Sequence, residues 1–141
     1  MTKTRLKHYR NNKKEIIQLR ARLEELETAL YYPKIPHLTD MPKGGNPEGN
    51  AQEDLAIYHI ELQAKYIAKL TELTAEQLAI ENAIEGLPQT ERMLMRFRYL
   101  DGLSWEEVCV RLGYAWTQTH EYHGRALQRL KEADETEEVE T

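Results

Sequence analysis

Two histidines lie three residues apart in the stretch THEYH, residues 119–123, with a glutamate between them. His120, Glu121 and His123 could bind a metal ion, or they could lie on a helix that reads DNA. Zinc proteases place two histidines at i and i+4 and add a third ligand. The spacing here is i and i+3, and no nearby cysteine or acidic cluster completes a tetrahedral set. The pattern therefore predicts no metal site and favours the DNA-reading helix.

Catalytic patterns are missing from the rest of the sequence. Cys109 is the single cysteine, so neither an intrachain disulfide nor a cysteine-based zinc site can form. We expect it to be a buried spacer between two helices. The sequence has no Gly-rich phosphate loop and no nucleophile elbow. We therefore expect a binding protein with no catalytic residues, cofactor or metal, and not an enzyme.

The composition predicts an all-α fold. Apolar residues make up 40% of the chain and charged residues 30%, which is typical of long helices that are partly exposed to water. A heptad pattern predicts a basic N-terminal helix at residues 1–30 that packs on a partner helix. Its seam consists of Tyr9, Asn12, Ile16, Leu19, Leu23, Leu26 and Leu30.

A second long helix is predicted at residues 52–86. Between the two helices, residues 31–51 hold four of the five prolines, which predicts a connector that no helix crosses. The two helices could fold back as an antiparallel hairpin or coiled coil. The apolar stripe of the second helix is wider than one partner needs, so we expect it also to pack on a second chain or on the C-terminal domain. The stripe consists of Leu55, Tyr58, Leu62, Tyr66, Leu70, Leu73, Leu78, Ile80 and Ile84.

Residues 87–131 predict a three-helix domain with a helix-turn-helix. The first helix has one apolar face, formed by Met93, Leu94, Phe97 and Leu100. A capping box at Ser104 starts the second helix. Gly113 then supplies the positive φ of a short turn, and the helix after it would enter the major groove. The acidic residues 132–141 are predicted to be a disordered tail.

Charge is unevenly distributed along the chain. The net charge is −5, yet the first 23 residues hold eight basic side chains and one acidic one, and six acidic residues follow position 131. An acidic total does not exclude nucleic acid, because local fields act at the binding face. The basic N-terminus is either a solvated helix face, which we favour, or a second DNA site. The tail could alternatively occupy the basic face as a nucleic-acid mimic.

The C-terminal residues carry a resemblance to a known family. Residues 87–130 read LPQTERMLMRFRYLDGLSWEEVCVRLGYAWTQTHEYHGRALQRL, which resembles the fourth region of sigma-70-type transcription factors, the region that binds the promoter −35 element. The whole arrangement is similar to phage-encoded late transcription regulators, the autolysin-regulator-like family. The resemblance implies double-stranded DNA and host RNA polymerase as partners, in a bacterial cytoplasm. Ala115 and Trp116 depart from the sigma pattern, so the −35 sequence is not carried over as the target.

The phase of the last helix predicts which side chains meet DNA. If Thr119, Tyr122, Ala126 and Leu130 face the core, the opposite side faces the groove. Gln118 can pair with adenine and Glu121 with cytosine, while Thr117 can meet thymine or phosphate. Trp116 either contacts DNA or packs against Trp105 or the linker. The remaining candidates are His120 for the groove and Arg111, Arg125 and Arg129 for phosphates.

Three functions fit these patterns. We expect a sequence-specific DNA-binding transcription regulator that self-associates, as a dimer or tetramer, through its N-terminal helices. A small DNA-packaging, terminase-like subunit is the first alternative, and a helical scaffold or adaptor is the second. No apolar run is long enough to span a membrane, so no membrane partner is expected.

Overall fold

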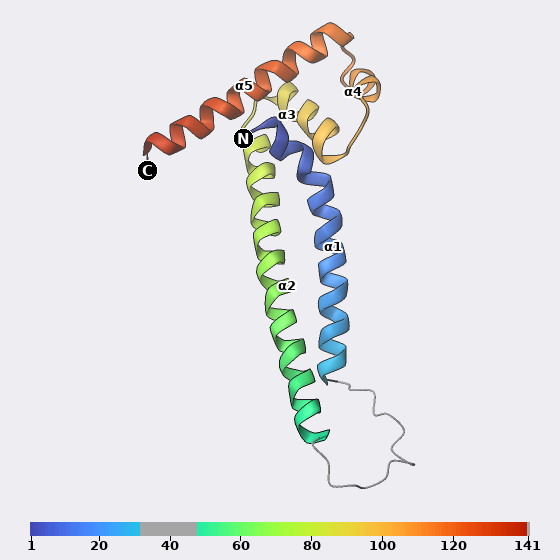
Figure 1. Cartoon of the computed structure of the whole chain (residues 1–141). Helices are drawn as coiled ribbons and strands as arrows, with labels where there is room; N and C mark the ends of the chain where they lie inside the picture. The colour runs from blue at the N-terminus through green and yellow to red at the C-terminus, as the bar shows by residue number, and fades with distance from the viewer. Residues whose placement is uncertain (32–47, 141) are drawn as a thin grey trace. The chain divides into compact units, whose positions relative to one another are not determined.

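The computed structural model describes residues 1–31 and 48–140, and within them it contains helices and no strands, which confirms the all-α prediction (Figure 1). None of the described helices has both the length and the apolar character that a membrane span requires. The helices in chain order are α1 Lys3–Tyr31, α2 Glu48–Glu85, α3 Gln89–Met95, η2 Arg96–Leu100, α4 Trp105–Leu112 and α5 Trp116–Glu140.

The chain forms two compact units, and the long helices contribute to both. One unit joins Met1–Lys14 to Leu73–Thr141, and the other consists of Glu15–Glu72. The sequence predicted residues 1–30 as a helix separate from the DNA-binding domain. Instead, the first turns of α1 belong to the same unit as the helix-turn-helix, because their apolar side chains join its core.

The core of the first unit draws on every helix. Leu6 and Tyr9 of α1 are buried together with Ile80 and Ile84 of α2 and with apolar residues of the C-terminal helices. At the edge of this core the Arg5 guanidinium donates to both carboxylate oxygens of Glu76, at 2.7 and 2.9 Å. Burial of several apolar side chains provides most of the stabilisation, at roughly 1.5–3 kcal/mol for each fully buried one.

The second unit contains the rest of the predicted heptad seam. Ile16 and Leu19 of α1 are buried, and Leu23, Leu26 and Leu30 are half-buried. On α2, Leu62, Tyr66 and Leu70 of the predicted stripe are half-buried. Several other large apolar side chains of α2 are exposed, including Leu55 and Tyr58, which the sequence placed on that stripe.

A π-helical turn changes the buried face of the first C-terminal helix. The predicted face held Met93, Leu94, Phe97 and Leu100, but the buried apolar residues are Leu94 and Met95, at 0% exposed, and Tyr99, at 5%. The α-helix ends at Met95, and over Arg96–Leu100 the backbone is π-helical, closed by a hydrogen bond from Asp101 N to Arg96 O of 2.9 Å. The wider turn shifts the phase of the helix and brings Tyr99 inward.

Element boundaries differ from the prediction at two places. α2 begins at Glu48, before the expected position 52, and the predicted connector at 31–51 lies mostly outside the described residues. The sequence predicted a disordered tail from residue 132, whereas α5 continues to Glu140. Hydrogen bonds one turn apart, from Gln128 to Glu132 (3.1 Å) and from Thr136 to the Glu132 carbonyl (2.9 Å), accompany this extension.

Candidate nucleic-acid interface

The helix-turn-helix is formed by α4, a short turn and α5. Ser104 caps α4, because its side-chain oxygen accepts a hydrogen bond of 3.2 Å from the Glu107 amide. Gly113 follows with a φ of 76°, a left-handed conformation that glycine adopts without steric cost. The predicted positive φ at Gly113 is therefore confirmed, and the turn leads directly into α5.

The phase of α5 agrees with the prediction. Thr119 and Ala126 are fully buried and Leu130 is 3% exposed. The Thr119 hydroxyl donates to the Ala115 carbonyl at 3.0 Å, so its polar atom is paired inside the core. Tyr122 is half-buried, with its ring 5.3 Å from that of Tyr114. These contacts fix which side of α5 faces away from the protein.

The opposite side of α5 is polar and exposed. Thr117, Gln118 and Glu121 are all exposed, and so is Gly124 one turn further along. Apart from its chain neighbours and the adjacent backbone of α5, a Cβ placed on Gly124 would meet no atom within 4 Å, so packing within the described chain does not explain a glycine in mid-helix. The absence of a side chain instead lets a partner approach the α5 backbone closely at this point. We call Thr117, Gln118 and Glu121 the recognition face.

His120 lies between the two tryptophans of the chain. Its ring centroid is 4.4 Å from Trp105 of α4 and 4.6 Å from Trp116 at the start of α5. The sequence predicted a groove-facing His120, but its ring is half-buried and its Nε2 atom has no hydrogen-bond partner among residues 1–31 and 48–140. Trp116 is 54% exposed and contacts His120 rather than Trp105 directly. His120 packs between the tryptophans, so it is not part of the recognition face.

Trp105 was not among the predicted site residues. Besides contacting His120, it accepts the Arg98 guanidinium over its ring at 4.8 Å. The only sequence signal for this role is that the two tryptophans of the chain begin the two helices of the motif.

His123 is buried in the core. It is 6% exposed, and its Nε2 lies 2.7 Å from the Tyr99 hydroxyl, which links α5 to the π-helical segment η2. Burial, with a smaller contribution from the nearby Lys3 charge, lowers the pKa of His123 to about 4. The histidine is therefore neutral at physiological pH and fixes the position of α5 instead of contacting a ligand.

The three predicted phosphate-binding arginines differ in their surroundings. Arg111 is exposed at the end of α4. Arg125 is exposed on α5, with its guanidinium 5.5 Å from the centre of the Tyr122 ring. Arg129 is instead paired with Glu91 of α3, at 3.0 and 3.2 Å from its two carboxylate oxygens, and that carboxylate is buried. Arg129 therefore neutralises the negative charge of the buried Glu91 carboxylate.

Cys109 is half-buried, not fully buried as predicted. It lies on α4, next to the fully buried Val108, so the face of α4 that packs on α5 is centred on Val108 rather than on the cysteine. No three histidine, cysteine or acidic side chains gather as a possible metal site in the part of the chain that the structure describes.

Comparison with known proteins gives one finding. Residues 77–130 match the family described as Sigma-70, region 4. The match starts within α2, includes α3, η2 and α4, and ends in α5 at residue 130, so it covers less than half of the chain and contains the turn and most of the recognition helix. No curated protein and no solved structure matches the chain.

Proposed function

We propose that this protein is a sequence-specific DNA-binding transcription regulator that inserts α5 into the major groove. The observation that carries the proposal is the two-sided character of α5. Thr119, Ala126 and Leu130 anchor one side in the core, and the recognition face lies exposed on the other. Amide and carboxylate side chains at Gln118 and Glu121 match the hydrogen-bonding groups of adenine and cytosine in the major groove.

The match to sigma-70 region 4 supports this choice over a purely structural helical domain, because that region is one of the helix-turn-helix modules of promoter recognition. We further propose that the target genes are phage late genes and that host RNA polymerase is a partner, within a bacterial cytoplasm. The resemblance of the whole arrangement to autolysin-regulator-like proteins supports these finer statements. The protein acts by binding, not as an enzyme.

Selection of bound DNA tests the proposal. The full chain is incubated at physiological salt with a library of duplexes that contain a randomised segment, and the bound fraction is amplified and sequenced over several rounds. We expect one enriched motif, since a helix-turn-helix discriminates a specific site from other DNA by several kcal/mol. The same selection with the recognition face replaced by alanine is the control. A library that stays random after repeated rounds contradicts sequence-specific binding.

We propose that α2 mediates self-association. Large apolar side chains that are about half-exposed follow a second heptad pattern on this helix, out of phase with the half-buried Leu62 and Tyr66. Positions three and four residues apart share one face of a helix, so this pattern forms a stripe. We name it the outer seam, and it consists of Ile57, Ile60, Ala64, Ile67 and Thr71.

The outer seam fits a second copy of α2. Three isoleucines at 48–56% exposure would be an unfavourable surface for a free helix, and coiled-coil packing removes such side chains from water. Two or more DNA-binding heads in one assembly would also raise affinity through effective concentration. This supports a dimer or tetramer as the active form.

Ile60→Glu with Ile67→Glu should weaken self-association at least tenfold, which corresponds to about 1.4 kcal/mol. Each substitution places a charge where an apolar contact is expected. Sedimentation or light scattering of the full chain measures the change. The matched control is Ala51→Glu with Ala79→Glu, which adds the same charge at exposed positions outside the outer seam. Equal masses for both variants would contradict the assignment, and eight or more subunits in the native protein would favour the DNA-packaging alternative.

A further inference from the structure

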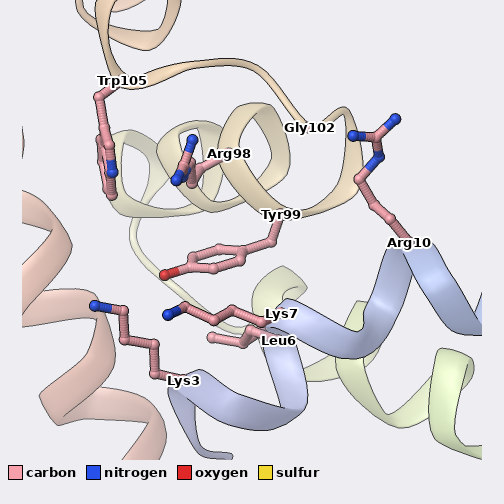
Figure 2. Close-up of a pocket in the computed structure, with 8 residues that line it drawn as sticks. All are labelled: Lys3, Leu6, Lys7, Arg10, Arg98, Tyr99, Gly102 and Trp105. Atoms are coloured by element: carbon pink, nitrogen blue, oxygen red, sulfur yellow. The ribbon is translucent and has the colours of Figure 1, made fainter.

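A basic cavity lies beside the helix-turn-helix, within the unit that contains both. It has a volume of about 450 Å³, and its lining comes from the first turns of α1 and from the segment that runs from η2 to the start of α4 (Figure 2). Four of the lining side chains are cationic and none is acidic. They are Lys3, Lys7 and Arg10 of α1 and Arg98 of η2. We name this cavity the basic pocket.

The three α1 cations share one face of the helix. Positions 3, 7 and 10 are spaced by four and three residues, and this spacing gathers like charges that destabilise an isolated helix. In Figure 2 the side chains of Lys3 and Lys7 both extend toward the side on which the Tyr99 hydroxyl lies. A cluster of this kind is stabilised when an anion binds to it.

Within the described residues, the three lysine and arginine side chains of α1 that line the pocket have no carboxylate partner. Arg5, on the same helix, is paired with Glu76, but no ion pair joins Lys3, Lys7 or Arg10 to a carboxylate in the described ranges 1–31 and 48–140. Asp101, the acidic residue beside the rim, is exposed and makes no such pair there. The positive charge of the basic pocket is therefore available to a ligand.

The other walls position the charges. The Arg98 guanidinium is held over the Trp105 ring and by a hydrogen bond of 2.9 Å to the Leu103 carbonyl. Arg10 packs against Gly102, which has a φ of 73°, and a Cβ at that glycine would overlap the Arg10 guanidinium. Tyr99 and Leu6 supply a buried apolar floor, and charges above a low-dielectric surface act more strongly on an anion than charges in water do.

We propose that the basic pocket is a phosphate-binding site, separate from the recognition face, that takes the oxygens of phosphate esters. Lysine and arginine are the side chains that bind phosphate, with lysine as a point charge and arginine as a planar fork. The phosphates come either from a nucleic-acid backbone or from a free small ligand. The site goes beyond the proposed function, because it does not involve the recognition face.

The first arm of the test uses inorganic pyrophosphate with the full chain at constant ionic strength, followed by calorimetric titration and thermal unfolding. The pocket variant is Lys3→Gln, Lys7→Gln and Arg10→Gln. The control variant, Lys13→Gln, Lys14→Gln and Arg20→Gln, removes the same charge from exposed positions of α1 outside the pocket. Saturable binding that raises the melting temperature of the native and control proteins, and that is at least tenfold weaker in the pocket variant, supports a free phosphorylated ligand.

The second arm uses a random-sequence duplex. The slope of log K against log salt should fall by about 0.9 for each phosphate contact that the pocket variant loses. A smaller slope in the pocket variant alone, without pyrophosphate binding, supports a nucleic-acid backbone as the source. Equal changes in the pocket and control variants, or no change in either arm, overturn the proposal.

Loss of folding would not explain weaker pyrophosphate binding by the pocket variant. The substitutions remove like charges from an exposed helix face, so we expect the pocket variant to melt at the same temperature as the native protein or higher. Lys7→Gln alone is the second variant, and it should weaken pyrophosphate binding several-fold if the pocket is used. The pyrophosphate arm does not require α5 to read DNA, so its outcome is separate from that of the motif selection.

Discussion

Gln118→Ala combined with Glu121→Ala should weaken binding to the selected DNA sequence by roughly 2–6 kcal/mol, at about 1–3 kcal/mol for each lost base contact. Both side chains are exposed on α5, and neither forms a hydrogen bond or ion pair within the described part of the chain. Their removal should therefore leave the fold intact while removing the hydrogen bonds to base edges.

Titration of a duplex that contains the selected motif, and of one with a scrambled motif, measures the effect. Non-specific affinity depends on phosphate contacts, so the scrambled duplex should bind the variant and the native protein equally well. The matched control is Gln52→Ala with Glu53→Ala, which removes the same two chemical groups from exposed positions on α2. A similar loss on both duplexes would show that these residues contribute only to general attraction.

Folding stability should fall by about 2 kcal/mol between pH 7.5 and pH 5 because of His123. Its pKa is lowered from 6.5 to about 4 by burial, so in this window the unfolded chain binds a proton that the folded chain does not. The contribution of neutral His123 to the free energy of unfolding is fully present above pH 6.5 and is lost as the pH falls toward 4. Each pKa unit corresponds to about 1.36 kcal/mol, which sets the size of the effect.

Chemical denaturation of the full chain at pH 7.5, 6.5, 5.5 and 5 measures this dependence. His123→Gln cannot take up a proton, yet its amide can still meet the Tyr99 hydroxyl, so its stability should change less over the same range. His8→Gln, on an exposed position of α1, is the control and should retain the native dependence. Parallel curves for the native protein and His123→Gln would show that another group is responsible.

Local patterns predicted the helix-turn-helix well. Periodicity located the buried side of α5 at Thr119, Ala126 and Leu130, and the side-chain chemistry of Ser104 and the freedom of Gly113 located the start and the end of α4. These features depend on residues close together in sequence, so a pattern of three or four residues is enough to show them.

Features that depend on distant residues were not predictable. No sequence pattern predicts the π-helical turn that buries Tyr99. The burial of His123 depends in turn on its hydrogen bond with Tyr99, which lies 24 residues earlier. The two tryptophans that pack against the His120 ring lie on different helices. The cationic side chains of the basic pocket come from α1 and η2, which are far apart in sequence, so only the tertiary fold brings these charges together.

The joining of Met1–Lys14 to Leu73–Thr141 in one unit has a consequence for the order of folding. During synthesis, Leu6 and Tyr9 leave the ribosome long before Ile84 and Leu94, which are part of the same core. The apolar side chains of the N-terminal segment therefore stay exposed to solvent until the later helices have been synthesised. Only then can the core of this unit form. Such long-range closure slows folding and exposes apolar surface to aggregation.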